Sequence, residues 1–182
     1  MKLVLLDRDG VINVDRPDSV KSKEEFVLLP QAIPAIRLLN KASIPVAIVT
    51  NQAVVGRGEL SKEELEGIHY YFQDMLHQEG ASIHKIYTCL SSDDAHPDRK
   101  PNPGLLFQAF NDFHVQAHEV AFIGDALRDL EAAKAANCAR VLVRTGKGEK
   151  TLHEGLPESV LPVNIFDTLY EAVSDIVKGG TC

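Results

Sequence analysis

The sequence predicts an α/β fold with a doubly wound parallel sheet. Five short apolar runs alternate along the chain with segments of helical pattern, and recognisable capping signals open two of these segments. Continuous apolar runs without strict alternation are typical of parallel strands that are buried on both faces. Strands that alternate with helices favour a doubly wound sheet. The 182 residues fit a single domain, 1–182, because about 150 residues is an ordinary one-domain size.

The strands are expected where short runs are rich in apolar and β-branched residues. In chain order these runs cover residues 3–6, 46–50, 85–89, 120–123 and 140–143. Between and after them the apolar residues follow a helical period near 31–42, 61–79, 103–113, 127–136 and 165–178. Ser61 and Glu64 have the spacing of a capping box, and Pro103 falls in a first helical turn. Two long irregular segments remain, 13–30 and 91–101, and such segments are usually functional in a compact domain.

Composition excludes several classes of function. The net charge of −7 disfavours nucleic-acid binding, because an acidic chain gains nothing from counterion release. No apolar run approaches the roughly 18 residues that span a bilayer, and the apolar start is shorter than the ~7–15 residues of a signal-peptide core. The three cysteines, Cys89, Cys138 and Cys182, are few and odd in number, which argues against a disulfide framework and favours a reducing compartment. We therefore expect a cytoplasmic protein with no nucleic-acid or membrane partner.

Polar residues that could take part in catalysis or binding lie at the ends of the expected strands. They are Asp7 and Asp9 after the first strand, Thr50, Asn51 and Gln52 at the second, Asp125 after the fourth with Asp129 four residues on, and Lys100 before the third helix. Ligands of such sheets bind beyond the carboxyl ends of the strands, at the topological switch point. We therefore expect these side chains to share one crevice.

Acidic groups gathered in one crevice need a compensating charge. Two carboxylates about 4 Å apart repel by roughly 4 kcal/mol at an effective dielectric constant of 20, so their pKa values rise unless a cation is present. Carboxylate oxygens with open positions beside them suit Mg²⁺. With the Thr50 hydroxyl and the Lys100 ammonium, they predict a site for a phosphoryl group. A lone Asp-x-Asp is more often a turn, and a lone Gly-Asp a helix cap; their joint placement favours chemistry.

The series Asp7-x-Asp9-Gly10-Val11, Thr50-Asn51, Lys100 and Gly124-Asp125-x-x-x-Asp129 resembles the four motifs of the haloacid dehalogenase superfamily of phosphohydrolases. Further segments resemble its subgroup of heptose bisphosphate and histidinol phosphatases, which includes enzymes of lipopolysaccharide-core biosynthesis. These segments are residues 7–13, 50–52, 57–58, 99–104 and 142–146. The resemblance implies a Rossmann-like core and a monomeric hydrolase that acts on a small phosphorylated sugar.

The resemblance also implies roles for individual residues. Asp7 would attack phosphorus and form an aspartyl-phosphate, which splits one difficult step into two. Asp9 would protonate the departing oxygen and then deprotonate the hydrolytic water, so we expect a raised pKa at Asp9. Mg²⁺ would be held by the Asp7 side chain, the Asp9 main-chain carbonyl and Asp125. Asp129 is expected to orient this group or to cap its helix, while Thr50 and Lys100 complete the catalytic set.

Many superfamily members insert a cap domain, but only 43 residues separate Asp7 from Thr50. A strand–helix–strand unit uses about 30 residues, so we expect a capless enzyme. Its specificity would come from loops 13–19, 52–58 and 91–99. Substrate-binding candidates in or beside these loops are Asn51, Gln52, Arg57 and Arg99. The two arginines could bind a sugar hydroxyl or a second phosphate, since guanidinium groups bind phosphate bidentately, or could be ordinary solvated side chains.

The sequence departs from the subgroup at the zinc loop, at Ala53 to Val55 and at Ala126. The subgroup commonly carries a zinc loop, but here Cys89-x-Ser91 and His96-x-Asp98 stand at its positions. Structural zinc sites need four Cys or His ligands, so we expect no zinc and regard Cys89 and His96 as remnants. Ala126 replaces a lysine, for which Arg128 could substitute only if its helix turns it inward. We expect Cys138 to be a core thiol and the histidines at 69, 77, 84, 114, 118 and 153 to lie on the surface.

Other functions remain open from the residues alone. Within the same chemistry, the substrate could be histidinol phosphate or another small phosphomonoester. A signalling receiver domain also gathers acidic residues, a threonine and a lysine around Mg²⁺. Receivers carry their phosphoacceptor aspartate at the end of the third strand, however, and here that strand ends at Cys89-Leu90. A catalytically silent module would have little reason to keep the four acidic and basic motif residues together.

Overall fold

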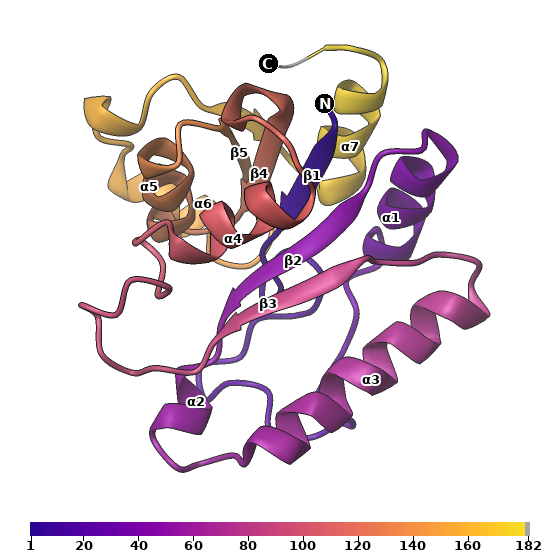
Figure 1. Cartoon of the computed structure of the whole chain (residues 1–182), viewed down its shortest axis with the longest axis vertical. Coiled ribbons are helices and arrows are strands. Elements are labelled where there is room, and N and C mark those ends of the chain that lie inside the picture. The colour runs from indigo at the N-terminus through magenta and orange to yellow at the C-terminus, as the bar shows by residue number, and fades with distance from the viewer. Residues whose placement is uncertain (181–182) are drawn as a thin grey trace.

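The computed structural model, in which residues 1–180 are described, contains one parallel sheet (Figure 1). Within these residues the sheet has six strands in the order β3-β2-β1-β4-β5-β6. The strands are β1 Leu3–Leu6, β2 Val46–Asn51, β3 Lys85–Cys89, β4 Val120–Gly124, β5 Ala139–Val143 and β6 Asn164–Phe166. Every neighbouring pair is parallel. This order confirms the doubly wound sheet and places its switch point between β1 and β4.

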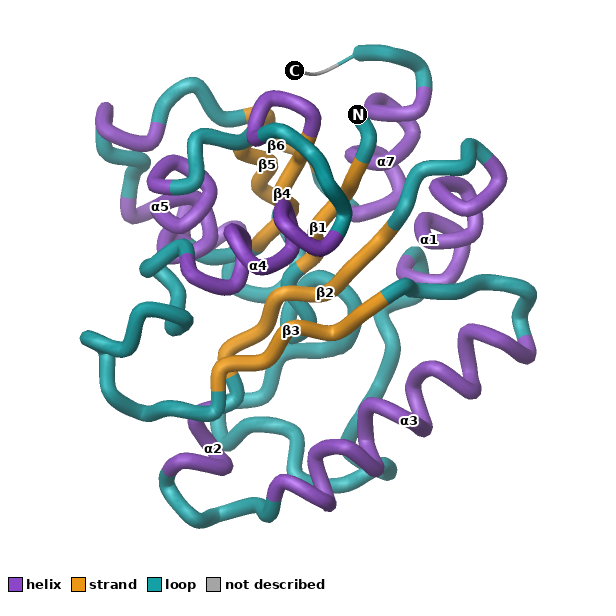
Figure 2. The backbone as a smooth tube through the Cα atoms, viewed as in Figure 1, coloured by secondary structure: helices purple, strands orange, loops and turns teal. Residues whose placement is uncertain are grey.

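Helices lie on both faces of the sheet (Figure 2). They are α1 Ala32–Lys41, α2 Ala53–Gly56, α3 Lys62–Gln78, α4 Gly104–Asp112, α5 Leu127–Ala135, α6 Gly148–Glu154 and α7 Leu169–Val177. Apolar residues of α1, α3 and α7 pack with Val4 and Leu6 of β1, whereas those of α4 and α5 pack with Leu3 and Leu5. Because successive residues of β1 point to opposite faces, this central strand is buried on both sides.

The expected helices and strands are confirmed within a few residues, with one correction at the carboxyl end. A helix was expected from residue 165, but Asn164–Phe166 form β6 at the sheet edge and α7 begins at Leu169. Thr168 caps α7, since its hydroxyl accepts a hydrogen bond from the Glu171 amide at 3.2 Å. A run of three residues is too short to give a strand signal. The helices α2 and α6 are not predicted either, because four and seven residues are too few to show a helical period.

The connections between the first three strands hold no inserted domain in the part of the chain that the structure describes. They consist of loops with α1, α2 and α3, which confirms the capless expectation. The capping box of α3 is also present, with reciprocal hydrogen bonds between Ser61 and Glu64 of 3.1 and 2.8 Å. None of the helices described in residues 1–180 is both long and apolar enough to cross a membrane.

The expectations for cysteine and histidine need one correction. Cys138 is buried as expected, and Cys182 lies outside the described residues. The expectation that His69 lies on the surface is wrong, because its exposed fraction is only 8%. Its place on the inward face of α3 was hidden by its polarity, while the other histidines predicted to be on the surface are exposed: His77, His84, His114, His118 and His153.

Candidate active site

The polar residues expected in one crevice meet at the carboxyl ends of β1, β2 and β4. Asp7 follows β1, Thr50 lies near the end of β2, and Asp125 follows β4 at the switch point. Lys100 reaches the same place from the loop before α4. A cavity of about 160 Å³ lies above them, and Asp7, Asp9, Thr50 and Lys100 line it. The sheet thus brings together residues that are up to 118 positions apart in sequence.

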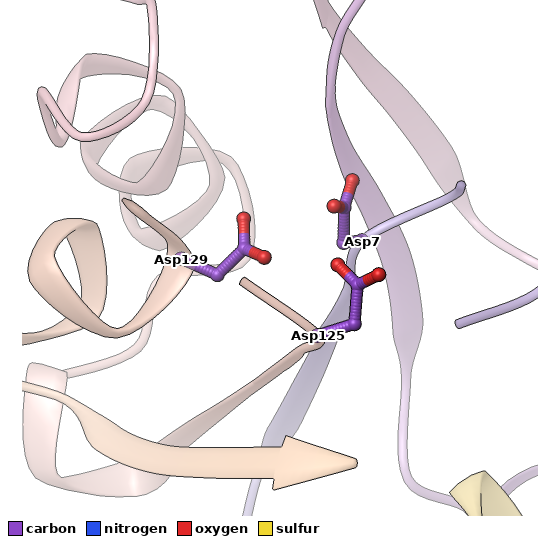
Figure 3. A group of neighbouring side chains, drawn as sticks. All are labelled: Asp7, Asp125 and Asp129. Atoms are coloured by element: carbon purple, nitrogen blue, oxygen red, sulfur yellow. The ribbon is translucent and has the colours of Figure 1, made fainter. Parts of the chain in front are cut away.

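Three buried carboxylates form the floor of this site (Figure 3). Asp7, Asp125 and Asp129 each offer an oxygen, and these atoms all lie within 4.8 Å of one another. The Lys100 ammonium lies 2.9 Å from Asp7 Oδ1 and 2.7 Å from Asp129 Oδ1. The floor therefore gathers three potential negative charges against one positive charge.

The imbalance appears in the pKa values of the floor. Burial, followed by the charges of Asp7 and Asp129, raises the pKa of Asp125 to about 8. Burial also raises the pKa of Asp7 to about 6, although the Lys100 charge opposes this rise. Burial lowers the pKa of Lys100, but the charges of Asp129 and Asp7 outweigh burial and raise it, so the ammonium stays charged. A divalent cation would supply the missing positive charge and release the protons.

Asp129 acts on the floor from the first turn of α5. Its Oδ2 accepts a hydrogen bond from the Ala126 amide at 3.1 Å, and its Oδ1 pairs with Lys100. It thus both caps the helix and orients the ammonium. A side chain at Gly124 would place its Cβ 2.3 Å from the Cβ of Asp129, so this close approach requires glycine.

Two glycine turns enclose the Asp125 carboxylate. Its Oδ2 accepts a hydrogen bond from the Lys147 amide at 2.7 Å. A Cβ at Gly10 or at Gly146, both with positive φ, would lie 2.0 or 2.1 Å from the same oxygen. The Thr145 hydroxyl donates to the Gly10 carbonyl at 2.6 Å and joins the two turns. The contribution of Lys147 was not predicted, because a main-chain donor leaves no signal in residue type.

Asp9 lies in the opposite electrostatic environment from the floor. Its Oδ1 accepts hydrogen bonds from Arg8 Nη2 and Asn13 Nδ2, each at 2.9 Å, and its Oδ2 accepts one from Gln52 Nε2 at 2.9 Å. Burial raises the pKa of Asp9, but the Arg8 charge and these hydrogen bonds outweigh burial and lower it. The expectation of a raised pKa at Asp9 is therefore wrong, because it follows from the proton-donor role and takes no account of the three hydrogen-bond donors.

Asn51 and Gln52, predicted to bind substrate, line the cavity and also bind the protein itself. Gln52 Nε2 donates to Thr50 Oγ1 at 2.9 Å as well as to Asp9, which leaves the Thr50 hydroxyl proton for another acceptor. Asn51 exchanges two hydrogen bonds with the main chain of Lys100, at 3.0 and 3.1 Å. Both amides therefore orient groups that were expected to act in catalysis.

Basic side chains surround the mouth of the cavity: Arg16, Arg57, Arg99, Arg128 and Lys147. Arg57 forms an ion pair with Glu59 at 2.6 Å, and Arg99 forms one with Asp94 at 2.8 Å. Arg128 forms no ion pair within residues 1–180, and α5 does turn it toward the cavity. The acidic chain therefore presents a locally basic mouth, which attracts anions.

The expected zinc remnants are separate from this site. Cys89 Sγ and His96 Nδ1 lie 3.9 Å apart, and His96 Nδ1 also faces the Asp98 amide at 3.2 Å. Across residues 1–180, the one group of three or more possible ligands close enough to hold a metal is the acidic floor. The expectation of no zinc stays a prediction.

Comparisons with known proteins agree with the geometry. A family model described as HAD-hydrolase-like matches residues 98–172. A D-glycero-β-D-manno-heptose-1,7-bisphosphate 7-phosphatase from Pseudomonas aeruginosa is 40% identical over 97% of this chain and 98% of its own. One from Neisseria meningitidis is 38% identical over 100% and 97%.

A solved structure leads to the same family. The D,D-heptose 1,7-bisphosphate phosphatase from Bordetella bronchiseptica, complexed with magnesium and phosphate, superposes with a TM-score of 0.92 at 37% identity. The match covers 99% of this chain and 100% of that one. The chain therefore belongs to the haloacid dehalogenase-like hydrolases and, within them, to the family of the heptose bisphosphate phosphatases.

Proposed function

We propose that this protein is a Mg²⁺-dependent phosphomonoesterase that removes the 7-phosphate of D-glycero-D-manno-heptose 1,7-bisphosphate. The meeting of three buried carboxylates and one ammonium under a basic mouth carries this proposal. Relatives that bear the name of this activity match nearly the whole chain. The three cysteines, few and odd in number, favour a reducing, cytoplasmic setting.

The acidic floor fits a divalent cation, because burial, together with the charges of neighbouring carboxylates, raises the pKa values of two of its carboxyl groups. The Asp7 side chain, the Asp9 main-chain carbonyl and Asp125 would hold Mg²⁺. When bound, the ion would neutralise charge on the phosphoryl oxygens. Lys100 and the Thr50 hydroxyl would bind the remaining phosphoryl oxygens from fixed positions, which is how phosphoryl transfer is usually catalysed.

In the first step, an Asp7 carboxylate oxygen forms a bond to phosphorus while the bond to the sugar oxygen breaks. The sugar oxygen keeps the electron pair and takes a proton from Asp9. Since the pKa of Asp9 is lowered in the free site, Asp9 is ionised there and must gain this proton as the substrate binds. The negative charge of the bound phosphate ester would raise the pKa of Asp9, and a monoester monoanion, whose second pKa is near 6, would carry the proton into the site.

In the second step, water attacks the aspartyl-phosphate and gives a proton to Asp9. The bond from phosphorus to Asp7 breaks, inorganic phosphate leaves and the Asp7 carboxylate is restored. Here the hydrogen-bond donors keep Asp9 ionised before water attacks, so the carboxylate is in the state that can take the proton.

The second phosphate of a bisphosphate would lie at the mouth of the cavity. Arg57 and Arg99 are candidates to bind it, but each already pairs with a carboxylate. Arg128 has no such partner among the residues described and lines the same cavity. We therefore propose Arg128 as the principal contact for the second phosphate, with Arg57 and Arg99 beside it.

A panel of phosphate esters tests the proposed function. Phosphate release is measured on the heptose bisphosphate, on sugar monophosphates and on histidinol phosphate, each with Mg²⁺ and with EDTA. We expect the largest kcat/KM for the bisphosphate and loss of turnover in EDTA. A higher kcat/KM for histidinol phosphate would overturn the substrate assignment, and full activity in EDTA would overturn the metal requirement.

A further inference from the structure

Arg8 stands between Asp7 and Asp9 in sequence, and its side chain is fully buried. Its Nη2 donates to Asp9 Oδ1 at 2.9 Å, and the guanidinium carbon lies 5.8 Å from the centre of the Phe26 ring. Its Nη1 lies 3.2 Å from Nε2 of His69, on helix α3. A helix remote in sequence thus contacts the side chain that holds Asp9.

The contact fixes the protonation of His69. A guanidinium has only donors, so Nε2 must accept the hydrogen bond and the ring proton must sit on Nδ1. Burial and the Arg8 charge lower the pKa of His69 to about 4, so the ring is neutral near pH 7. His69 is therefore a neutral acceptor for a buried cation and carries no charge of its own.

A buried guanidinium is held in direction by the acceptors of its N–H groups. An N–H without an acceptor in a buried site is costly, so the side chain would turn to find another partner. If Nη1 lost His69, Arg8 would retain Asp9 and the Phe26 ring, neither of which fixes its rotation. The direction of the Asp9 carboxylate depends in turn on Nη2, because Arg8 is one of its three donors.

We propose that His69 is a positioning residue for phosphoryl transfer, which acts through Arg8 to align the Asp9 carboxyl group with the departing oxygen of the substrate. This inference rests on the proposed function, in which Asp9 gives its proton to that oxygen. His69 touches neither substrate nor metal ligand. The competing explanation is that His69 only fills space under α3.

The leaving group distinguishes the two explanations. An alkoxide from a sugar phosphate needs a proton as it departs, whereas p-nitrophenolate departs without one. The ratio kcat/KM reports the steps up to that departure. We expect His69→Leu to lower kcat/KM on the sugar phosphate about tenfold and on p-nitrophenyl phosphate by less than about twofold, in line with the cost of a small misplacement. The inhibition constant of inorganic phosphate should not change.

Two further variants serve as rescue and control. His69→Gln keeps an acceptor oxygen that can reach Arg8 and should restore most of the activity on the sugar phosphate. His77→Leu removes an exposed histidine from the same helix and should match the wild type on both substrates. If His69→Leu does not fold, His69→Asn replaces it, since its shorter amide does not reach Nη1.

The outcomes separate this inference from the proposed function. Equal losses on the two substrates, no loss on either, or failure of His69→Gln to rescue would overturn the positioning role. A wild-type protein that releases no phosphate from any ester would overturn the proposed function instead. Selective loss on the sugar phosphate with rescue by glutamine supports the role.

Discussion

Asp7 and Asp9 are separated by one residue, yet they belong to opposite electrostatic regions. Asp7 lies on a floor where three carboxyl groups share one ammonium, and its pKa rises to about 6. Asp9 lies in a cradle of donors from Arg8, Asn13 and Gln52, and its pKa falls. The floor is built to receive positive charge, and the cradle is built to hold an anion. Environment, and not residue type, shifts the pKa values of the two carboxyl groups in opposite directions and suits them to the different roles proposed for them.

The largest expected effect comes from the floor. Asp7→Asn replaces the proposed nucleophile by a side chain of the same shape, so turnover should fall by at least about 10⁴-fold while the protein stays folded. Phosphate release and thermal melting measure the two outcomes. Residual turnover near the wild-type rate would show that another group attacks phosphorus.

The cradle should respond less strongly and in a different way. Asp9→Asn removes the group proposed to transfer protons, so turnover should fall about 10²- to 10⁴-fold. The main-chain carbonyl of residue 9 remains, so Mg²⁺ should still raise the melting temperature as in the wild type. Loss of the Mg²⁺ effect in this variant would show that the Asp9 side chain belongs to the floor.

The protonation of the floor makes stability depend on pH. In the metal-free protein the folded Asp125 binds its proton up to about pH 8, while the unfolded chain releases it near pH 4. Stability without metal should therefore fall as pH rises from about 4 to about 8. Mg²⁺ should raise the melting temperature more at pH 8 than at pH 6, where protons compete with it.

Asp125→Asn is the matched variant for this measurement. It removes one negative charge from the floor and keeps an oxygen that can accept from the Lys147 amide. In EDTA it should melt above the wild type at pH 8, and Mg²⁺ should no longer stabilise it. A variant that is still stabilised by Mg²⁺ would place the ion elsewhere.

The smallest effect is expected at the mouth. Arg128→Ala should raise KM for the heptose bisphosphate about tenfold, since a charged hydrogen bond contributes roughly 1.5–3 kcal/mol, and should leave a sugar monophosphate unaffected. Lys134→Ala, on the exposed side of the same helix, is the control. An equal rise in KM for both substrates would contradict a contact with the second phosphate.

Much of the fold and the floor could be predicted from the sequence. Buried parallel strands leave continuous apolar runs, and the residues at their ends must meet at one edge of the sheet. The strand ends alone therefore predict that Asp7, Thr50 and Asp125 lie at one edge of the sheet, where the structure has them. The short strand β6 left no comparable run.

The hydrogen-bond contacts around Asp9 and Asp125 could not be predicted in the same way. Arg8 and His69 are in contact although they are 61 positions apart in sequence, and neither residue type predicts this contact. The Lys147 amide that holds Asp125 belongs to the main chain, which every residue has. The sign of the Asp9 pKa shift depends on Arg8, Asn13 and Gln52, and residue type alone does not show that these side chains turn toward Asp9.

The ion pairs of the basic side chains at the mouth of the cavity affect the release of the product. Arg57, Arg99 and Lys147 each face a carboxylate of the protein, at 2.6, 2.8 and 3.0 Å. An incoming phosphate must displace these carboxylates, and they return when it departs, so binding there is an exchange of partners with a modest net gain. The proposed product still carries one phosphate. When the carboxylates of the protein re-form their ion pairs with these cations, they displace that phosphate, which favours dissociation of the product.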